Sequence, residues 1–259
     1  MSLRVAVQMD PLEKINISGD STFALMLSAQ ARGHKLYHYL AEDLTYNDGR
    51  LYAGAHEVSV QAVVGNHFSL GAFAILDLGR DVDVVLMRQD PPFDLGYITA
   101  THLLERIQSE TLVVNDPAAV RNAPEKIWVL DFAQFMPPTM VTRSLGAARK
   151  FLADHGEIVL KPLHGNAGKA VFKIGRDGAN LAPLMELFNA AYREPHMLQA
   201  FLPEVAEGDK RIVLVDGEVA GAINRRPSSG EIRSNLAAGG TAEAADLTET
   251  EREICAALG

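Results

Sequence analysis

Cysteine is almost absent from this sequence. Cys255 is the only one among the 259 residues, so no disulfide can form within the chain. A chain without disulfides is typical of a reducing compartment, which predicts a cytoplasmic location. Nothing around this single thiol indicates a catalytic nucleophile.

Long apolar runs and a surplus of positive charge are also missing. No apolar run approaches the length of a membrane-spanning helix, and Asp10 comes too soon after the start for a signal peptide. The formal net charge of −9 argues against nucleic acid or an anionic membrane as the main partner, because both attract basic surfaces. We expect a soluble protein with no nucleic-acid and no membrane partner.

What the sequence does contain is enough apolar material for a sizeable core. Hydrophobic residues make up 47% of a chain that is long enough for about two domains. In the first half, predicted strands at residues 3–9, 35–40, 82–88 and 111–114 alternate with helices, which indicates an α/β domain with a parallel sheet. Residues 51–80 show no strong period, and we assign them no structure.

Ligands of such sheets bind beyond the carboxyl ends of the strands. The polar residues that fall there, which we take as candidate substrate contacts, are Asp10, Asn16, Asp20, Ser21, Arg88 and Asp90. Two interpretations of Arg88 remain open. It either anchors a substrate or forms an ordinary ion pair with Asp90 or Asp94.

After Pro117 the pattern changes to short strands and helices. Asp216-Gly217 stands between two apolar runs and is a strong signal for a β-hairpin. We predict a first, substrate-binding domain at residues 1–120 and a second, α+β domain with antiparallel strands at residues 121–259.

Residues 157–174 contain an apolar strand, a glycine loop and a second strand. Lys161 lies within the first apolar run, where an ammonium group needs an anionic partner or a route to solvent. Gly165 and Gly168 would let backbone N–H groups turn toward an anion. The loop is not a P-loop, because its spacing is too short and Ala170 stands in place of the hydroxyl residue. A nucleotide-phosphate site and a plain hairpin with Lys161 on an edge strand both remain open.

Seven short motifs are spread over nearly the whole chain. They are Met-Asp-Pro at 9–11, Ile-Asn-Ile at 15–17, Met-Arg-Gln-Asp-Pro-Pro-Phe-Asp at 87–94, Glu-Lys at 125–126, Leu-Lys-Pro-Leu at 160–163, Gly-Asp-Lys-Arg at 208–211 and Asn-Leu-Ala-Ala-Gly-Gly at 235–240. Together they resemble the prokaryotic glutathione synthetases, a family of ATP-grasp ligases. The block at 87–94 is the most specific, since ATP-grasp ligases in general lack it. The resemblance implies a Rossmann-like pre-ATP-grasp domain followed by an ATP-grasp domain that is truncated at its C-terminal end.

The resemblance also implies an activity. γ-Glutamylcysteine would be joined to glycine through an acyl phosphate on the cysteinyl carboxylate, while ATP becomes ADP and phosphate. Phosphoryl transfer between anions requires positive charge and exclusion of water. The implied cofactors are ATP and Mg²⁺ (or Mn²⁺), and the implied assembly is a homotetramer.

Family roles place a nucleotide site in the second domain. The residues that would bind the phosphates are Lys126, Lys161, Gly165 and Gly168. Those that would surround the adenine are Gln199, Ala200, Phe201 and Leu202, and Asp209 would lie near the ribose. Each has a plainer alternative when taken alone. Gln199 and Leu202 could be ordinary strand residues, and Asp209 could be a turn residue before a hairpin.

The same family roles define a catalytic group and a lid. Phosphate and transition-state charge would be held by Arg211, Arg225, Arg233 and Asn235, because guanidinium forks suit oxyanions. Gly239 and Gly240 would form a lid over the phosphates. The alternative for Arg225 is a solvated pair with Arg226.

Three positions depart from the family pattern. Ala167 stands where a glycine is common, Ala200 replaces a residue with an amide side chain, and His164 replaces a carboxylate. The first restricts the loop backbone, the second leaves adenine to main-chain contacts, and the third changes the local charge.

The family continues past Gly259 into strands that carry the magnesium ligands. Thr248 to Glu251 reads as a helix capping box, so Glu249 and Glu251 belong to the first turn of a helix rather than to a metal site. We therefore expect no metal ligands within residues 1–259 and an inactive fragment of an active enzyme. Glutathione formation by the 259-residue chain would contradict this expectation.

Two other functions remain open on the sequence alone. One is a different ATP-grasp ligase that joins another carboxylate to an amine, which the block at 87–94 disfavours. The other is a nucleotide-binding module without catalysis, suggested by the missing metal ligands.

Overall fold

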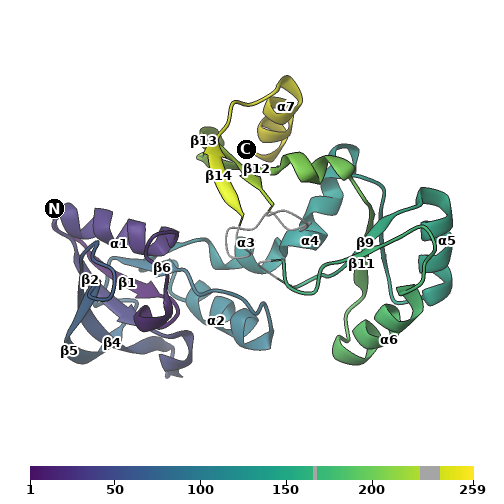
Figure 1. The fold of residues 1–259 in the computed structure, drawn as a ribbon. Coiled ribbons are helices and arrows are strands. Elements are labelled where there is room, and N and C mark those ends of the chain that lie inside the picture. Colours follow the sequence, from purple (N-terminus) through teal and green to yellow (C-terminus); the bar gives the residue numbers. More distant parts are fainter. Residues whose placement is uncertain (166–167, 228–239) are drawn as a thin grey trace. The chain divides into compact units, whose positions relative to one another are not determined.

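The computed structural model describes residues 1–165, 168–227 and 240–259 of the chain. The chain forms two compact units, residues 1–124 and 125–259 (Figure 1). Within the described ranges there is no helix with the length and apolar character needed to cross a membrane.

The first unit is built on a seven-stranded mixed sheet. Its strands are β1 (Arg4–Gln8), β2 (Lys35–Tyr39), β3 (Leu44–Asn47), β4 (Arg50–Val60), β5 (Phe68–Asp77), β6 (Val84–Met87) and β7 (Leu112–Val114). Its helices are α1 (Ser21–Ala31), α2 (Leu95–Glu105) and α3 (Pro117–Asn122), with 3-10 turns at Leu12–Lys14 and Ala41–Asp43. Strands β2, β1, β6 and β7 are neighbours in that order, and they lie parallel, as the alternating pattern predicts.

Both faces of the parallel part are covered, which follows from the alternation of side chains along β1. Val5 and Val7 pack on one face with Phe23 of α1, whereas Ala6 packs on the other face with Leu104 of α2. Helices α1 and α2 therefore cover opposite faces, and the carboxyl ends of the strands stay open for ligands.

Residues 51–80, which the sequence left unassigned, form most of the long antiparallel hairpin of β4 and β5. Strand β4 pairs with β2 and β3 along one edge and with β5 along the other. The tight turn predicted from Asn47-Asp48-Gly49 joins β3 to β4, with Asp48 and Gly49 at φ of 47° and 83°.

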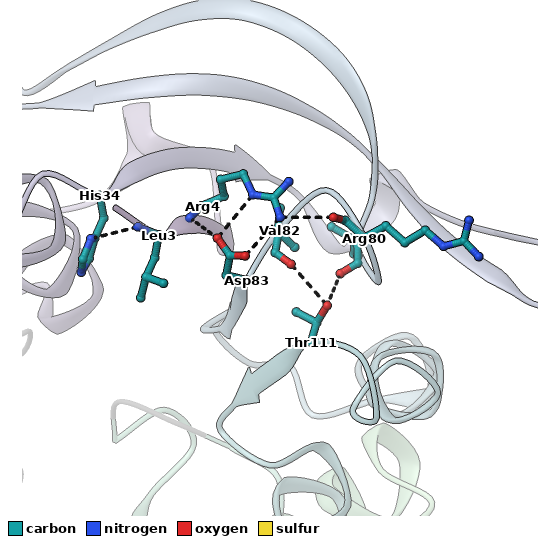
Figure 2. Close-up of polar contacts among 8 residues, drawn as sticks. Leu3, Arg4, His34, Arg80, Val82, Asp83 and Thr111 are labelled. Atoms are coloured by element: carbon teal, nitrogen blue, oxygen red, sulfur yellow. Dashed lines mark hydrogen bonds and ion pairs between the residues drawn. The ribbon is translucent and has the colours of Figure 1, made fainter. Parts of the chain in front are cut away.

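A polar cluster ties the amino ends of β1, β6 and β7 together (Figure 2). The backbone N–H of Arg4 donates to Asp83 at 2.7 Å, and its guanidinium donates to the other carboxylate oxygen at 3.1 Å and to the carbonyl of Arg80 at 3.2 Å. The hydroxyl of Thr111 donates to the carbonyl of Leu78 at 2.7 Å. Hydrogen bonds from Arg4 hold the pKa of Asp83 below its usual range. We call Arg4, Arg80, Asp83 and Thr111 the amino-end cluster.

The described residues of the second unit form two antiparallel sheets. The first has the order β10-β9-β11-β8 and consists of β8 (Thr139–Thr142), β9 (Ile158–Pro162), β10 (Phe172–Ile174) and β11 (His196–Ala200). Helices α5 (Leu145–His155) and α6 (Leu181–Ala191) cover one of its faces through Phe151, Leu152, Met185 and Phe188. A short helix, α4 (Glu125–Trp128), and a 3-10 segment at Val129–Phe135 precede this sheet.

The second sheet of this unit has three strands. They are β12 (Asp209–Val215), β13 (Glu218–Arg226) and β14 (Thr241–Ala244), preceded by a 3-10 turn at Pro203–Glu207 and followed by α7 (Glu249–Leu258). The predicted β12–β13 hairpin turns at Asp216 and Gly217, with φ of 50° and 77°. A parallel-sheet unit followed by an antiparallel α+β unit is the fold class that the sequence predicts.

Candidate functional site

Lys161 lies on the face of the first sheet of the second unit that is opposite α5 and α6. In β9, Ile158 and Leu160 point into the core against α5 and α6, so Val159 and Lys161 point to the opposite face. Because Gln199 of β11 is paired with Val159, it shares that face, and the ammonium group of Lys161 donates to its side-chain oxygen at 2.5 Å. The alternative with Lys161 on an edge strand is wrong, because β9 lies between β10 and β11.

Lys126 reaches the same region from α4. Its ammonium group donates to the carbonyl of Gly165 at 2.6 Å and lies 3.3 Å from the carboxylate of Glu125. Burial lowers the pKa of Lys161, and the nearby charge of Lys126 lowers it further. Two ammonium groups are thus held near one glycine loop, in an arrangement that attracts a polyanion.

The residues predicted to surround adenine follow directly along the chain. Gln199 also donates from its amide nitrogen to the hydroxyl of Thr139 at 2.9 Å, so both ends of its side chain are fixed. The N–H groups of Ala200 and Phe201 donate to the carbonyls of Pro138 and Glu157. The ammonium of Lys173, which the sequence did not single out, lies 3.8 Å from the centre of the Phe201 ring. Leu202 is exposed.

Asp209, Arg211 and Arg225 share one face of the β12–β13 hairpin. Asp209 is paired with Arg225 and Arg211 with Ile223, and residues two apart on a strand project to the same side. Arg225 donates to both carboxylate oxygens of Asp209, at 2.7 and 2.8 Å. Arg211 is exposed. The catalytic candidates Arg233 and Asn235 and the lid residue Gly239 lie outside the described residues, whereas Gly240 immediately precedes β14.

In the first unit, Arg88 follows β6 and is held by the start of α1. Its guanidinium donates to the hydroxyls of Ser21 at 2.9 Å and Thr22 at 3.0 Å. Asp20 caps the same helix by accepting from the N–H of Phe23 at 2.7 Å. The guanidinium of Arg88 therefore bonds to this helix, while its backbone N–H donates to the carbonyl of Gln8. Ser21 was predicted to contact substrate, but Thr22 was missed, because a threonine in a helical first turn gives no signal of its own.

Asp10 and Asp90 meet where β1 and β6 end. The N–H of Asp90 donates to the carboxylate of Asp10 at 2.7 Å. Burial raises the pKa of Asp90, the charges of Asp10 and Asp20 raise it further, and the Arg88 guanidinium opposes them. Asn16 lies before α1, and its side-chain oxygen accepts from the N–H of Ser18 at 3.2 Å in a local turn.

An open hollow of about 510 Å³ lies over these strand ends. Its polar lining combines residues that were predicted with others that were not, namely Asp10, Lys14, Glu42, Gln89, Asp90, Asp94 and Tyr97. Burial raises the pKa of the Tyr97 phenol, while nearby Arg88 lowers it. Tyr97 lies in the first turn of α2, where the sequence pattern is that of a packed helix and does not reveal a ligand contact.

The described residues do not form a metal cage of their own. In residues 1–165, 168–227 and 240–259 there is no group of three or more histidine, cysteine, aspartate or glutamate side chains that could hold a metal ion. Glu251 instead accepts from Lys210 at 2.7 Å and completes the predicted capping box with Thr248.

Comparison with known proteins identifies both units. Residues 3–121 match the model of the prokaryotic glutathione synthetase N-terminal domain, and residues 125–259 match that of the prokaryotic glutathione synthetase ATP-grasp domain. The chain belongs to the prokaryotic glutathione synthetase family. Its resemblance to this family, inferred from short motifs, is confirmed.

Named relatives agree with this family assignment. The glutathione synthetase of Rhodopseudomonas palustris is 54% identical over 259 residues, which cover all of this chain and 82% of that protein. That of Agrobacterium fabrum is 52% identical over 98% of this chain and 80% of that protein. Members of this ATP-grasp family are ATP-dependent ligases that form a C–N bond, and the chain is such a ligase acting on small molecules.

Solved structures show the same fold at low identity. A crystal structure of a D-cycloserine synthetase superposes with a TM-score of 0.65 at 20% identity, over 98% of this chain and 78% of that one. The D-alanyl-alanine synthetase A of Vibrio cholerae superposes with a TM-score of 0.58 at 14% identity, over 100% and 79%. The predicted ATP-grasp fold is confirmed.

Proposed function

We propose that the reaction of this ligase is the joining of γ-glutamylcysteine to glycine with conversion of ATP to ADP and phosphate, and that an acyl phosphate is the intermediate. The relatives that carry the glutathione synthetase name support these substrates. The alternative of another carboxylate–amine ligase has less support, since the structures of that kind are only 14–20% identical.

The ATP site that we propose uses the face of the β10-β9-β11-β8 sheet that α5 and α6 do not cover. Lys126 and Lys161 would bind the phosphates beside the loop from Gly165 to Gly168, and residues 199–202 would surround the adenine. Asp209 would lie near the ribose, with Arg211, Arg225, Arg233 and Asn235 toward the transferred phosphate and Gly239-Gly240 as the lid. Because the described residues form no metal cage, Mg²⁺ (or Mn²⁺) would enter with the nucleotide, bound by phosphate oxygens and water.

The charge pattern of the hollow in the first unit is the observation that carries the choice of substrate. The γ-glutamyl end of γ-glutamylcysteine has a free ammonium and a free carboxylate on one carbon. Asp10 and Asp90 line the hollow and offer carboxylates to the first group. The guanidinium of Arg88 does not line the hollow, but its charge acts on Asp90 and Tyr97, which do, and it suits the second group. We propose that this hollow binds the γ-glutamyl end.

Calorimetric titration with matched ligands tests this assignment. Glutarylcysteine lacks only the ammonium group, so we expect it to bind at least about tenfold more weakly than γ-glutamylcysteine, since a hydrogen bond to a charged group contributes about 1.5–3 kcal/mol. Asp90→Asn should reduce the difference between the two ligands. Equal affinities, or binding of D-alanine in place of γ-glutamylcysteine, would contradict the proposal.

For the whole protein we propose a cytoplasmic homotetramer in which the first domain, residues 1–120, binds the peptide substrate and residues 121–259 bind ATP. The family assignment supports this arrangement. Light scattering during gel filtration measures the assembly, and a mass other than that of four chains would contradict it.

A further inference from the structure

Lys173 of β10 closes a ring of three contacts beside the residues that we assign to adenine. Its ammonium group lies 2.9 Å from the carboxylate of Glu157 and 3.8 Å from the centre of the Phe201 ring. The N–H of Phe201 in turn donates to the backbone carbonyl of Glu157 at 2.9 Å. Each of these three residues therefore contacts both of the others, and we call them the Lys173 cluster.

Strand pairing places Lys173 on the same face of the sheet as Lys161. Lys173 is paired with Val159 and Val159 with Gln199, and paired residues of antiparallel strands project to the same side. Val159 and Lys161 alternate with the core residues of β9, so all four side chains lie on the face opposite α5 and α6. Lys173 thus belongs to the face that we assign to ATP.

The contacts of Lys173 fix Phe201 more than they stabilise the fold. The ion pair is 33% exposed on the side of Lys173 and 36% on the side of Glu157, and such pairs contribute little to stability. A cation over an aromatic ring is attracted by the negative face of the ring, so the ammonium group holds the ring of Phe201 in place. Because Phe201 follows directly after β11, these contacts determine where the chain runs as it leaves the sheet.

We propose that Lys173 is a positioning residue of the ATP site, which acts on the base through Phe201 and does not bind the phosphates. A stretch of chain that contacts a base binds it more tightly when it is already held in place. The carboxylate of Glu157 neutralises the ammonium group of Lys173, which makes this lysine a poor phosphate ligand. The inference rests on the proposed ATP site, and it adds a residue that lies outside all seven motifs of the sequence.

Two ligands separate the base from the phosphates and so test this role. ATP carries both, whereas inorganic tripolyphosphate carries only the phosphates. We expect Lys173→Met to weaken the binding of ATP with Mg²⁺ by about fivefold or more, and to change the binding of tripolyphosphate by less than about twofold. Lys173→Arg should restore the affinity for ATP, because a guanidinium keeps both the ion pair and the contact with the ring.

A matched control and a double-mutant cycle complete the experiment. Lys150→Met, at an exposed lysine of α5 paired with Asp154, should change neither affinity. If Lys173 acts through the ring, Lys173→Met should weaken ATP binding no further once Phe201→Leu has removed the ring. Urea denaturation of Lys173→Met should give a free energy of unfolding close to that of the wild type, since the ion pair is partly exposed.

The possible failures of this inference differ from a failure of the proposed function. Equal losses of affinity for both ligands would show that Lys173 binds the phosphates, and an unchanged affinity for ATP would show that it has no part in the site. Additive losses in the double variant would overturn a role through Phe201. Each of these results leaves the proposed reaction intact. A wild-type chain that binds neither ligand would overturn the proposed ATP site and this inference with it.

Discussion

Lys161 is a residue whose charge is poorly solvated in the folded chain. Its side chain is partly buried, and its ammonium group donates to the neutral side-chain amide of Gln199. A lowered folded-state pKa means that the charged form costs stability at neutral pH, because a lysine ionises more readily in the unfolded chain. Such a residue is best explained by a ligand that supplies the missing negative charge.

We predict that Lys161→Met weakens ATP binding by about tenfold or more, since a charged hydrogen bond contributes about 1.5–3 kcal/mol. The free energy of unfolding without ligand should be unchanged or higher, because the substitution removes a buried charge. Titration calorimetry and urea denaturation measure the two quantities. Lys150→Met, at an exposed lysine paired with Asp154, is the control and should change neither. ATP binding equal to that of the wild type would remove the phosphate role.

Asp90 should oppose folding for a similar reason. Its folded-state pKa is raised, so its contribution to stability is present below the unfolded pKa of about 3.9 and is lost as the pH rises through the folded value. We predict that Asp90→Asn raises the melting temperature at pH 7 and that this gain shrinks as the pH falls toward about 4. Its affinity for γ-glutamylcysteine should fall at the same time.

Differential scanning fluorimetry across this pH range checks the prediction for Asp90. Glu42→Gln is the matched control, because Glu42 is another carboxylate that lines the hollow, and it should not change the melting temperature. A lower melting temperature for Asp90→Asn at pH 7 would show that the ionised carboxylate stabilises the fold.

At the scale of elements, the capping box of α7 offers a clean measurement of local stability. The hydroxyl of Thr248 accepts from the N–H of Glu251 at 3.3 Å, and the Glu251 carboxylate accepts from the N–H of Thr248 at 2.7 Å. We predict that Thr248→Ala lowers the free energy of unfolding by about 1 kcal/mol. Glu253→Ala, in the same helix but outside the cap, should change it by less than about 0.5 kcal/mol. Urea denaturation measures both changes, provided that the variants and the wild type have equal m-values. Equal losses of stability in the two variants would contradict the role of the cap.

The sequence predicts elements whose signals are local, and it misses those that depend on distant partners. The turns at Asp48-Gly49 and Asp216-Gly217 are evident from two residues, because only a few residue types adopt left-handed backbone angles. The β4–β5 hairpin is not evident, since a bulge and an exposed apolar face remove the period of two that marks a strand. The parallel pairing of β2, β1, β6 and β7 is predicted because strands that alternate with helices form parallel sheets, but the order of these strands is not.

In the candidate site, too, the sequence reveals some residues, while other contacts are evident only in the folded chain. Asp10, Arg88 and Asp90 are predicted because they end strands of a parallel sheet, where ligands bind. The contacts of Arg88 with Ser21 and Thr22 join residues 66 and 67 positions apart, so only the folded chain shows them. Likewise, Lys161 is recognised as unusual from its apolar neighbours, but its place on a central strand depends on β11.

At the scale of the whole molecule, the two compact units should respond to different ligands. We predict that ATP with Mg²⁺ raises the free energy of unfolding of residues 125–259 and shifts their unfolding transition to higher temperature. The gain should be about 2.7 kcal/mol when the free ligand is a hundredfold above its Kd. γ-Glutamylcysteine should raise the transition of residues 1–124 instead. Scanning calorimetry with each ligand alone measures both, and a shift of the same transition by both ligands would contradict the assignment of sites to units.

The amino-end cluster has a consequence for how this ligase can change. Arg4, Asp83 and Thr111 secure the strands at the end of the sheet opposite the hollow, so stability and recognition depend on separate residues of the same strands. A library that randomises residues 10–14 and 88–97 while the cluster is kept should therefore retain many folded members. Variants that accept other amino-acid substrates could be selected from such a library, because the unchanged cluster would keep the sheet stable.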